Sequence, residues 1–343
     1  MPHISLNPAT GKVERTFQGC DDRHLDGALE ETRTAQKIWR MTGFTQRAEA
    51  LRRAAEILMA THDDHAALIT REMGKPLREA RAEVEKCALT CDYYALHAAE
   101  FLADEPVETD AARSTVSYPP LGAVLAIMPW NFPFWQVFRV AAPALMAGNA
   151  VVLKHAPNVP QCALAMEEIF LAAGLPKGLF TALTIETNQV AGIIADPRIH
   201  AVTFTGSEQV GRQVAAEAGR NLKKCVLELG GSDPFVVLRD ADLDEASTQA
   251  VNSRFLNNGQ SCIAAKRFIV VPEIADEFVR LMARKVAALR VGDPMKEDTQ
   301  IGPMARLDLR EELHRQVTDS IAQGAQALLG CEPLAGEGAY YLP

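Results

Sequence analysis

The sequence has no dense run of basic residues, although Lys and Arg are plentiful. It contains 35 Lys and Arg residues against 44 Asp and Glu residues, which gives a formal net charge of −9 at pH 7. Proteins that bind nucleic acid carry clustered positive charge on one face or along one helix. We therefore expect no nucleic-acid partner.

Export and membrane signals are also missing. The first residues, MPHISLNPATGK, contain neither the cationic nor the apolar part of a secretory signal, so we expect a cytoplasmic protein. One long stretch, Ser114–Leu153, has Arg139 as its single charged residue. Prolines at positions 119, 120, 129, 133 and 143 interrupt it too often for a helix in lipid, which argues against a membrane span.

The cysteines and histidines form neither a disulfide framework nor a metal site. Seven cysteines are an odd number, and without an export signal they are expected to be free thiols. The eight histidines supply no set with the spacing of zinc ligands. We therefore expect no metal.

The chain is long enough for two domains and for a sizeable core, because 48% of its 343 residues are hydrophobic. Between Thr45 and Cys91, apolar residues recur at helical spacing, which predicts a pair of long amphipathic helices joined near Gly74 and Pro76. Residues 104–118 are polar and are expected to be extended.

After this segment, short apolar runs alternate with helical segments, which is typical of βαβ units and a parallel sheet covered on both faces. The expected strands are 124–128, 150–153, 179–185, 201–205, 225–229, 235–238 and 268–271. The expected helices are 133–147, 159–173, 187–195, 242–256 and 274–290. Two glycines after Leu229 interrupt the pattern. We predict an α/β protein with a Rossmann-like, doubly wound domain over residues 1–228 and a second α/β domain over residues 229–343.

A doubly wound domain raises the question of a nucleotide, yet the usual motifs are missing. There is no G-x-G-x-x-G fingerprint, and the segment from Gly206 to Arg212 lacks the Lys-Ser/Thr ending of a phosphate-binding P-loop. Gly206 and Ser207 join a strand to a helix, where free N–H groups can bind phosphate, or where the glycine only makes a turn. Lys154 ends a strand, where it reaches a nucleotide or is merely solvated.

Three side chains stand out as catalytic candidates. Cys262 lies in the polar segment NNGQSC, whereas the other six cysteines fit core or surface positions. Glu228 lies among apolar residues at the end of a strand. If its side chain is buried, its raised pKa would suit it to act as a general base; the alternative is that it points to solvent. Asn131, in the turn PWNFP, either donates to an oxyanion or caps the next helix.

Taken together, these segments resemble a known family. PWNFP, LKHAP, FTGS, ELGG and NNGQSC, in this order and at these separations, are similar to the motifs of the aldehyde dehydrogenase superfamily. REMGKP, AIMPWNFPFWQV, LKHAPNV, KKCVLELGGSDPF and AAKRF resemble, more narrowly, the bacterial succinate-semialdehyde dehydrogenases of the Sad type. The resemblance runs from ISLNPATGK to the end of the sequence.

The resemblance implies a mechanism with the cofactor NAD or NADP. Cys262 would attack the aldehyde to give a thiohemiacetal and then a thioester, Asn131 would stabilise the oxyanion, and Glu228 would activate water. The implied cofactor-binding residues are Trp130, Lys154, Gly206, Ser207, Gly211 and Leu229. The first domain would then bind NAD(P), and the second would supply the thiol.

Substrate and cofactor choice are less fixed by the resemblance. Pro157 stands where NAD-preferring relatives often have a glutamate, so no carboxylate repels a 2′-phosphate there. Arg139 matches a position that binds the substrate carboxylate, but a second expected arginine is replaced by Leu256. Betaine aldehyde or an aminoaldehyde is the alternative substrate, and a cationic Arg139 disfavours both.

The family continues beyond the point where this sequence stops, so we expect an incomplete fold that lacks the C-terminal strands of the family. The resemblance implies a homodimer or homotetramer for the complete protein, with the extended segment 104–118 toward the interface. An alternative of another class is a truncated, non-catalytic relative that binds nucleotide without turnover.

Overall fold

The computed structural model describes residues 3–336 and 338–343, which form two compact units. Unit 1 contains the residues up to Ser5, Thr16–His65 and Arg81–Leu229, and unit 2 contains Leu6–Arg15, Ala66–Ala80 and Gly230–Pro343. The predicted domains were continuous stretches, whereas two short N-terminal segments pack with unit 2. One reason is that the Asn258 side chain donates to the carbonyl of Gly74 at 2.8 Å.

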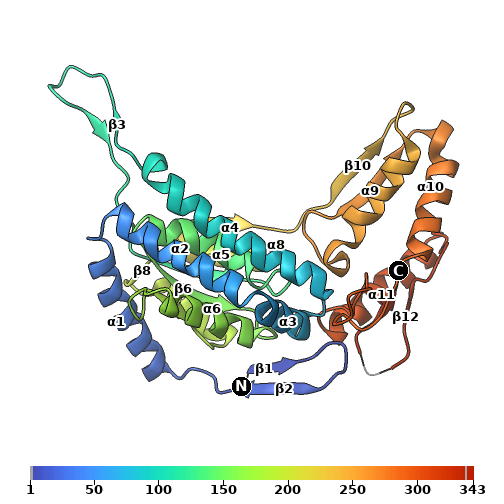
Figure 1. Cartoon of the computed structure of the whole chain (residues 1–343), viewed down its shortest axis with the longest axis horizontal. Coiled ribbons are helices and arrows are strands. Elements are labelled where there is room, and N and C mark those ends of the chain that lie inside the picture. Colours follow the sequence, from blue (N-terminus) through green and yellow to red (C-terminus); the bar gives the residue numbers. More distant parts are fainter. Residues whose placement is uncertain (1–2, 337) are drawn as a thin grey trace. The chain divides into compact units, whose positions relative to one another are not determined.

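A five-stranded parallel sheet forms the centre of unit 1 (Figure 1). Its strands are β5 (Ala123–Met128), β6 (Ala150–His155), β7 (Phe180–Ala182), β8 (Ile199–Thr205) and β9 (Lys224–Glu228), in the order β7-β6-β5-β8-β9. All four pairings are parallel. The order reverses between β5 and β8, as in a doubly wound fold, which confirms the predicted α/β class.

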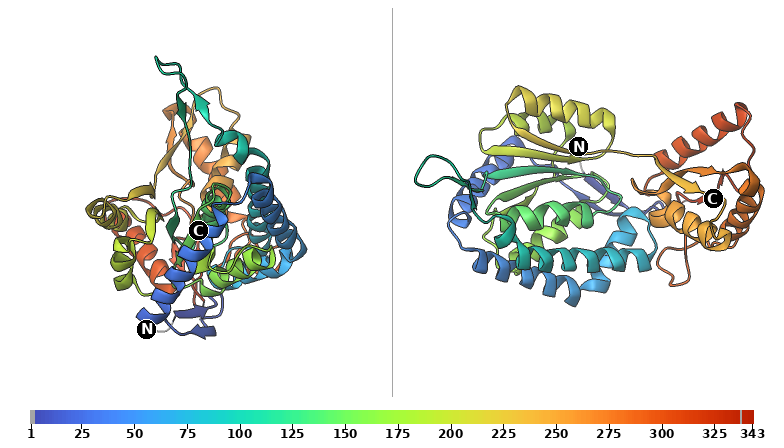
Figure 2. Two further views of the ribbon diagram at one scale, coloured as in Figure 1. Left: turned by 90° about the vertical axis from the view of Figure 1, so that its left-hand side faces the viewer. Right: turned by 90° about the horizontal axis from the view of Figure 1, so that it is seen from above.

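The connecting helices cover this sheet on both faces, with α8 on one side and α5 and α6 on the other (Figure 2, right). They are α5 (Trp135–Met146), α6 (Pro160–Ala172), α7 (Val190–Ala195) and α8 (Glu208–Arg220), and a short 3-10 turn, η1 (Thr187–Gln189), precedes α7. Burial on both faces explains why the central strands are almost wholly apolar.

The helical region before the sheet contains one more break than the sequence predicts. Helices α2 (Phe44–Ala60), α3 (His62–Met73) and α4 (Leu77–Phe101) replace the expected pair. The join at residues 74–76 is confirmed, whereas the break at Thr61 was not predicted. Thr61 is the C-cap of α2: its backbone leaves the helical region, at φ −112° and ψ 24°, while its hydroxyl donates to the Ile57 carbonyl at 2.7 Å.

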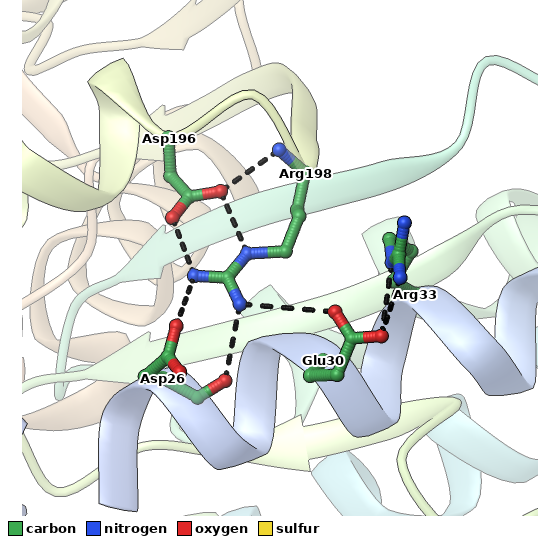
Figure 3. Close-up of polar contacts among 5 residues, drawn as sticks. All are labelled: Asp26, Glu30, Arg33, Asp196 and Arg198. Carbon is green, nitrogen blue, oxygen red and sulfur yellow. Dashed lines mark hydrogen bonds and ion pairs between the residues drawn. The ribbon is translucent and has the colours of Figure 1, made fainter. Parts of the chain in front are cut away.

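Helix α1 (Asp22–Trp39), also absent from the prediction, is tied to the turn before β8 by Arg198 (Figure 3). The Arg198 guanidinium lies 2.7 Å from an Asp196 oxygen and 2.8 Å from an Asp26 oxygen. It also approaches Glu30, which binds Arg33. The Asp196 pKa is lowered chiefly by this hydrogen bond, so the pair stays charged at neutral pH.

Between α4 and β5 the chain forms an exposed antiparallel hairpin, with strands β3 (Glu105–Pro106) and β4 (Thr115–Val116). It extends away from the rest of unit 1 (Figures 1 and 2). This is the segment predicted to be extended. Its part in an oligomer interface stays a prediction.

Unit 2 contains the parallel strands β10 (Asp233–Val237) and β11 (Ala265–Val270), with helices α9 (Leu243–Phe255) and α10 (Pro272–Ala287) and a 3-10 turn, η2 (Leu256–Gly259). Val237, Ala250 and Phe278 form its buried cluster. Helix α11 (Leu307–Ala322) and a short pair, β12 (Glu332–Pro333) with β13 (Tyr341–Leu342), follow. The N-terminal strands β1 (His3–Leu6) and β2 (Val13–Phe17) pair with each other.

Candidate active site

A cleft of about 660 Å³ opens at the carboxyl ends of β5, β6 and β8 in unit 1. Helices α7 and α8 supply much of its remaining wall. Lys154, Gly206 and Ser207, which were candidates from the sequence, all line this cleft. A crevice at the carboxyl ends of the strands, where the strand order reverses, is the usual ligand site of a doubly wound sheet.

Gly206 and Ser207 make the turn from β8 into α8. The Ser207 hydroxyl caps α8 by accepting from the Val210 N–H at 3.4 Å, so ordinary turn and cap chemistry is present. A Cβ on Gly206 would lie 2.6 Å from the Phe204 ring, which leaves no room for a side chain. The helix N-terminus faces the cleft with its partial positive charge, as a phosphate requires.

Two further candidates, Gly211 and Leu229, pack behind this turn. A Cβ on Gly211 would lie 2.6 Å from the Cδ2 atom of Leu229, so glycine allows α8 to approach the end of β9 closely. Neither residue is among the described residues that line the cleft, and the same is true of Trp130. Contact of these three residues with a nucleotide therefore stays a prediction.

Lys154 is partly buried in the cleft wall and is not simply a solvated strand end. Burial lowers the pKa of its ammonium group, and the charge of Glu186 acts in the opposite direction. Arg212 and Arg220 also line the cleft, and Glu217, the acidic residue among the described lining residues, forms an ion pair with Arg220 at 2.6 Å. The cleft therefore has an excess of positive charge.

Asn131 lies in the turn between β5 and α5, and it is not the cap of that helix. The N-cap position is Phe134, which makes no side-chain capping bond. The N–H groups of Phe134 and Trp135 donate instead to the carboxylate of Glu83, at 2.8 and 2.9 Å. The capping explanation for Asn131 is therefore wrong.

Glu228 and Arg139 are neighbours. Their charged groups lie 3.7 Å apart, and Arg139 also donates to the Thr205 hydroxyl at 2.9 Å. The sequence left open whether Glu228 is buried. Its side chain is 56% exposed, because β9 is the last strand of the sheet among the described residues. A carboxylate in this position is open to water and held by a cation.

Cys262 is exposed, in the turn between η2 and β11 that was predicted to be polar. The loop before it is unusual, because Asn257, Asn258 and Gly259 all have positive φ, at 59°, 56° and 74°. Asparagine and glycine are the residues that tolerate this region. The residue types at these three positions therefore explain how the loop can adopt this backbone conformation.

Two cations that the sequence analysis did not single out hold this loop. Arg254 donates to the carbonyls of Gly259 at 2.7 Å and Ala265 at 3.3 Å, on either side of Cys262. Lys266 donates to the carbonyl of Cys262 itself at 2.9 Å and to that of Gly231 at 2.6 Å. The motif AAKRF contained this lysine, but only the fold assigns it a partner.

Two possible features are not found in the part of the chain that the structure describes. No group of three or more His, Cys, Asp or Glu side chains is placed to hold a metal ion. Nor is any described helix both long and apolar enough to cross a membrane.

Comparison with known proteins decides the family. The model of the aldehyde dehydrogenase family matches residues 3–343. The chain belongs to the aldehyde dehydrogenase family. It is therefore an oxidoreductase enzyme by descent, and the family resemblance read from its motifs is confirmed.

Among curated aldehyde dehydrogenases, a probable succinate-semialdehyde dehydrogenase [NADP(+)] from a Synechocystis strain is 52% identical over 343 residues, which is 100% of this chain and 76% of that protein. The succinate semialdehyde dehydrogenase [NAD(P)+] Sad of Escherichia coli is 49% identical over 99% of this chain and 74% of its own length.

A solved structure also matches closely. The succinic semialdehyde dehydrogenase of Streptococcus pyogenes, in complex with NADP+, has a TM-score of 0.97 and 38% identity, over 99% of this chain and 75% of that one. The fold is thus that of aldehyde dehydrogenases, and the chain spans about three quarters of the length of these relatives.

Proposed function

We propose that this protein oxidises succinate semialdehyde, or a similar short aldehyde with a carboxylate, to the carboxylic acid with NADP+ or NAD+ as the cofactor. The observation that carries the proposal is the 52% identity over the whole chain to a probable succinate-semialdehyde dehydrogenase. In support, Cys262, Glu228, Asn131 and Lys154 lie in the segments NNGQSC, ELGG, PWNFP and LKHAP, which resemble the motifs of the family.

The residues of the cleft fit a dinucleotide. Lys154 would bind a ribose or phosphate, and the glycine turn at Gly206 with the N-terminus of α8 would receive the pyrophosphate. When bound, the nicotinamide accepts the hydride that leaves the substrate carbon. Pro157 lines the same cleft, where a carboxylate would repel a 2′-phosphate, so NADP+ is accepted.

The protein's own residues carry the remaining chemistry. The Cys262 thiolate forms a bond to the aldehyde carbon while the carbonyl π bond opens to an oxyanion, which the Asn131 amide stabilises by donating a hydrogen bond. Loss of hydride converts this adduct to a thioester. Glu228 takes a proton from water as the water attacks, the carbon–sulfur bond breaks, and the acid and the free thiol are released.

Arg139 supports an anionic substrate. Its guanidinium is the one charge in the stretch Ser114–Leu153, and it lies beside Glu228, the proposed base. A substrate carboxylate is attracted by this cation, whereas the positive charge of betaine aldehyde or an aminoaldehyde is repelled. This difference favours succinate semialdehyde over those alternatives.

The test is NADPH formation with succinate semialdehyde in the wild type and in Cys262→Ala, with binding of NADP+ measured in parallel. We expect activity in the wild type and its loss in the variant, while both bind the cofactor. Full activity in the variant would contradict the role of Cys262. Cofactor binding without turnover in the wild type would favour a non-catalytic relative.

A further inference from the structure

The turn that carries Asn131 is held at its C-terminal end by buried side chains from two other elements. It spans residues 129–133, between the end of β5 and the start of α5. His155, at the end of β6, binds its main chain at one point, and Glu83, on α4, binds the first N–H groups beyond it. Both side chains are almost fully buried, with exposed fractions of 5% and 4%.

His155 makes two good hydrogen bonds as a neutral ring. Its Nε2 atom lies 2.9 Å from the carbonyl oxygen of Pro133, and its Nδ1 atom accepts from the Ala156 N–H at 2.9 Å. A nitrogen that accepts cannot also carry a proton in the neutral ring, so the proton belongs on Nε2, where it is donated to Pro133. The Met128 carbonyl, 3.2 Å from Nδ1, is then a close neighbour rather than an acceptor.

Glu83 completes the arrangement from α4. One carboxylate oxygen accepts from both the Phe134 and the Trp135 N–H groups, the free donors at the start of α5. A negative charge at a helix N-terminus is favourable. The residue that follows the turn is therefore fixed as firmly as the residue that ends it.

The register of β6 against β5 places His155 next to both the Asn131 turn and the cleft. His155 lies beside Met128, the last residue before the turn, in the pairing of β6 with β5. Successive side chains of a strand point to opposite faces, so Lys154 lines the cleft while His155 points to the turn. Two adjacent residues of one strand thus serve the cofactor site and the Asn131 turn.

We propose that His155 is a positioning residue for Asn131. Its hydrogen bond to the Pro133 carbonyl, together with the bonds from the Phe134 and Trp135 N–H groups to Glu83, fixes the turn so that the Asn131 amide can donate to the oxyanion. This inference rests on the proposed function, because the oxyanion arises in aldehyde oxidation. It predicts a much larger effect on the chemical step than on cofactor binding, since Lys154 and the turn at Gly206 are left in place.

The kinetic test compares His155→Leu with His155→Gln. Leucine removes the donor, whereas the glutamine amide N–H can still reach the Pro133 carbonyl. Loss of a complete oxyanion donor costs about 10²–10³ in kcat. We expect His155→Leu to lower kcat about 10- to 100-fold with the KM for NADP+ within about 2-fold, and His155→Gln to recover most of the loss.

A double-mutant cycle separates positioning from general loss of structure. If His155 acts through Asn131, then His155→Leu lowers kcat by less than about 2-fold when Asn131 is already alanine. The same fold loss in both backgrounds would overturn the proposal, as would an unchanged kcat in His155→Leu. His24→Leu, at a side chain that is 78% exposed, is the matched control and should behave nearly as the wild type.

Amide hydrogen exchange tests whether His155 holds the Asn131 turn, independently of enzyme activity. In His155→Leu, amide exchange in a peptide covering residues 128–136 should accelerate at least about 10-fold, while peptides from β10 and β11 stay unchanged. Unchanged exchange in the first peptide would show that His155 does not hold the turn. If the wild type oxidises no aldehyde, the proposed function fails, and this measurement still decides the structural part.

Discussion

The burial of His155 predicts a pH dependence of stability with a definite sign. Its pKa is lowered from 6.5 to about 4, chiefly by burial. Between these values the unfolded chain binds a proton that the folded protein does not, so acid favours unfolding. The contribution of His155 to stability is complete above pH 6.5 and is progressively lost as the pH falls toward 4. Each pH unit in this window is worth about 1.4 kcal/mol, so the change from pH 7 to pH 5 costs about 2 kcal/mol.

The assay is urea unfolding followed by tryptophan fluorescence. Trp39, Trp130 and Trp135 are the protein's three tryptophans, and all lie in unit 1 with His155, so the signal reports that unit. Other groups also titrate in this range, and the informative quantity is therefore the difference between the wild type and His155→Gln, which has no ring to protonate.

We expect the free energy of unfolding to fall by about 2 kcal/mol more in the wild type than in His155→Gln between pH 7 and pH 5. His24→Gln, at a side chain that is 78% exposed, is the matched control and should leave the wild-type dependence unchanged. An equal pH dependence in the wild type and His155→Gln would refute the assignment of a buried, neutral ring.

Three further predictions concern other parts of unit 1. Pro157→Glu places a carboxylate in the cleft, where it would repel the 2′-phosphate of NADP+. Initial-rate assays should show the KM for NADP+ rising more than about 10-fold relative to the KM for NAD+, and equal changes in the two KM values would contradict a position of Pro157 beside the 2′-phosphate. Arg139→Ala should raise the KM for succinate semialdehyde far more than that for an uncharged aldehyde, and equal effects would remove its role in substrate choice. Arg198→Met leaves Asp196 without its ion-pair partner and should cost about 2 kcal/mol in urea unfolding. Arg198→Lys should lose less because it keeps the positive charge, but it should not reach the wild type because an ammonium cannot form the two-pronged bond; no loss in either variant would show that α1 does not depend on Arg198.

The sequence predicted the central sheet well, because its strands are covered on both faces and therefore read as apolar runs. The runs at 124–128, 150–153 and 201–205 lie within β5, β6 and β8. Their carboxyl ends form the cleft, which is why Lys154 and the turn at Gly206 could be singled out before the fold was known.

Other features depend on neighbours that no local pattern records. Glu228 follows apolar residues, but Val226 on the same strand is itself 59% exposed, because β9 ends the sheet in the described part of the chain. His155 stands in an ordinary strand, and only the fold brings its ring to the Pro133 carbonyl. Glu83 likewise reads as one more charged residue of a helix until α4 packs beside the start of α5.

The central claim is that Cys262 carries the substrate as a thioester. The most direct measurement is rapid quenching of the protein during turnover of succinate semialdehyde with NADP+, followed by mass spectrometry of its peptides. We expect an acyl group on the peptide that contains Cys262, formed only when aldehyde and cofactor are both present. Continued turnover with the acyl group on another cysteine, or with none on any peptide, would contradict the claim.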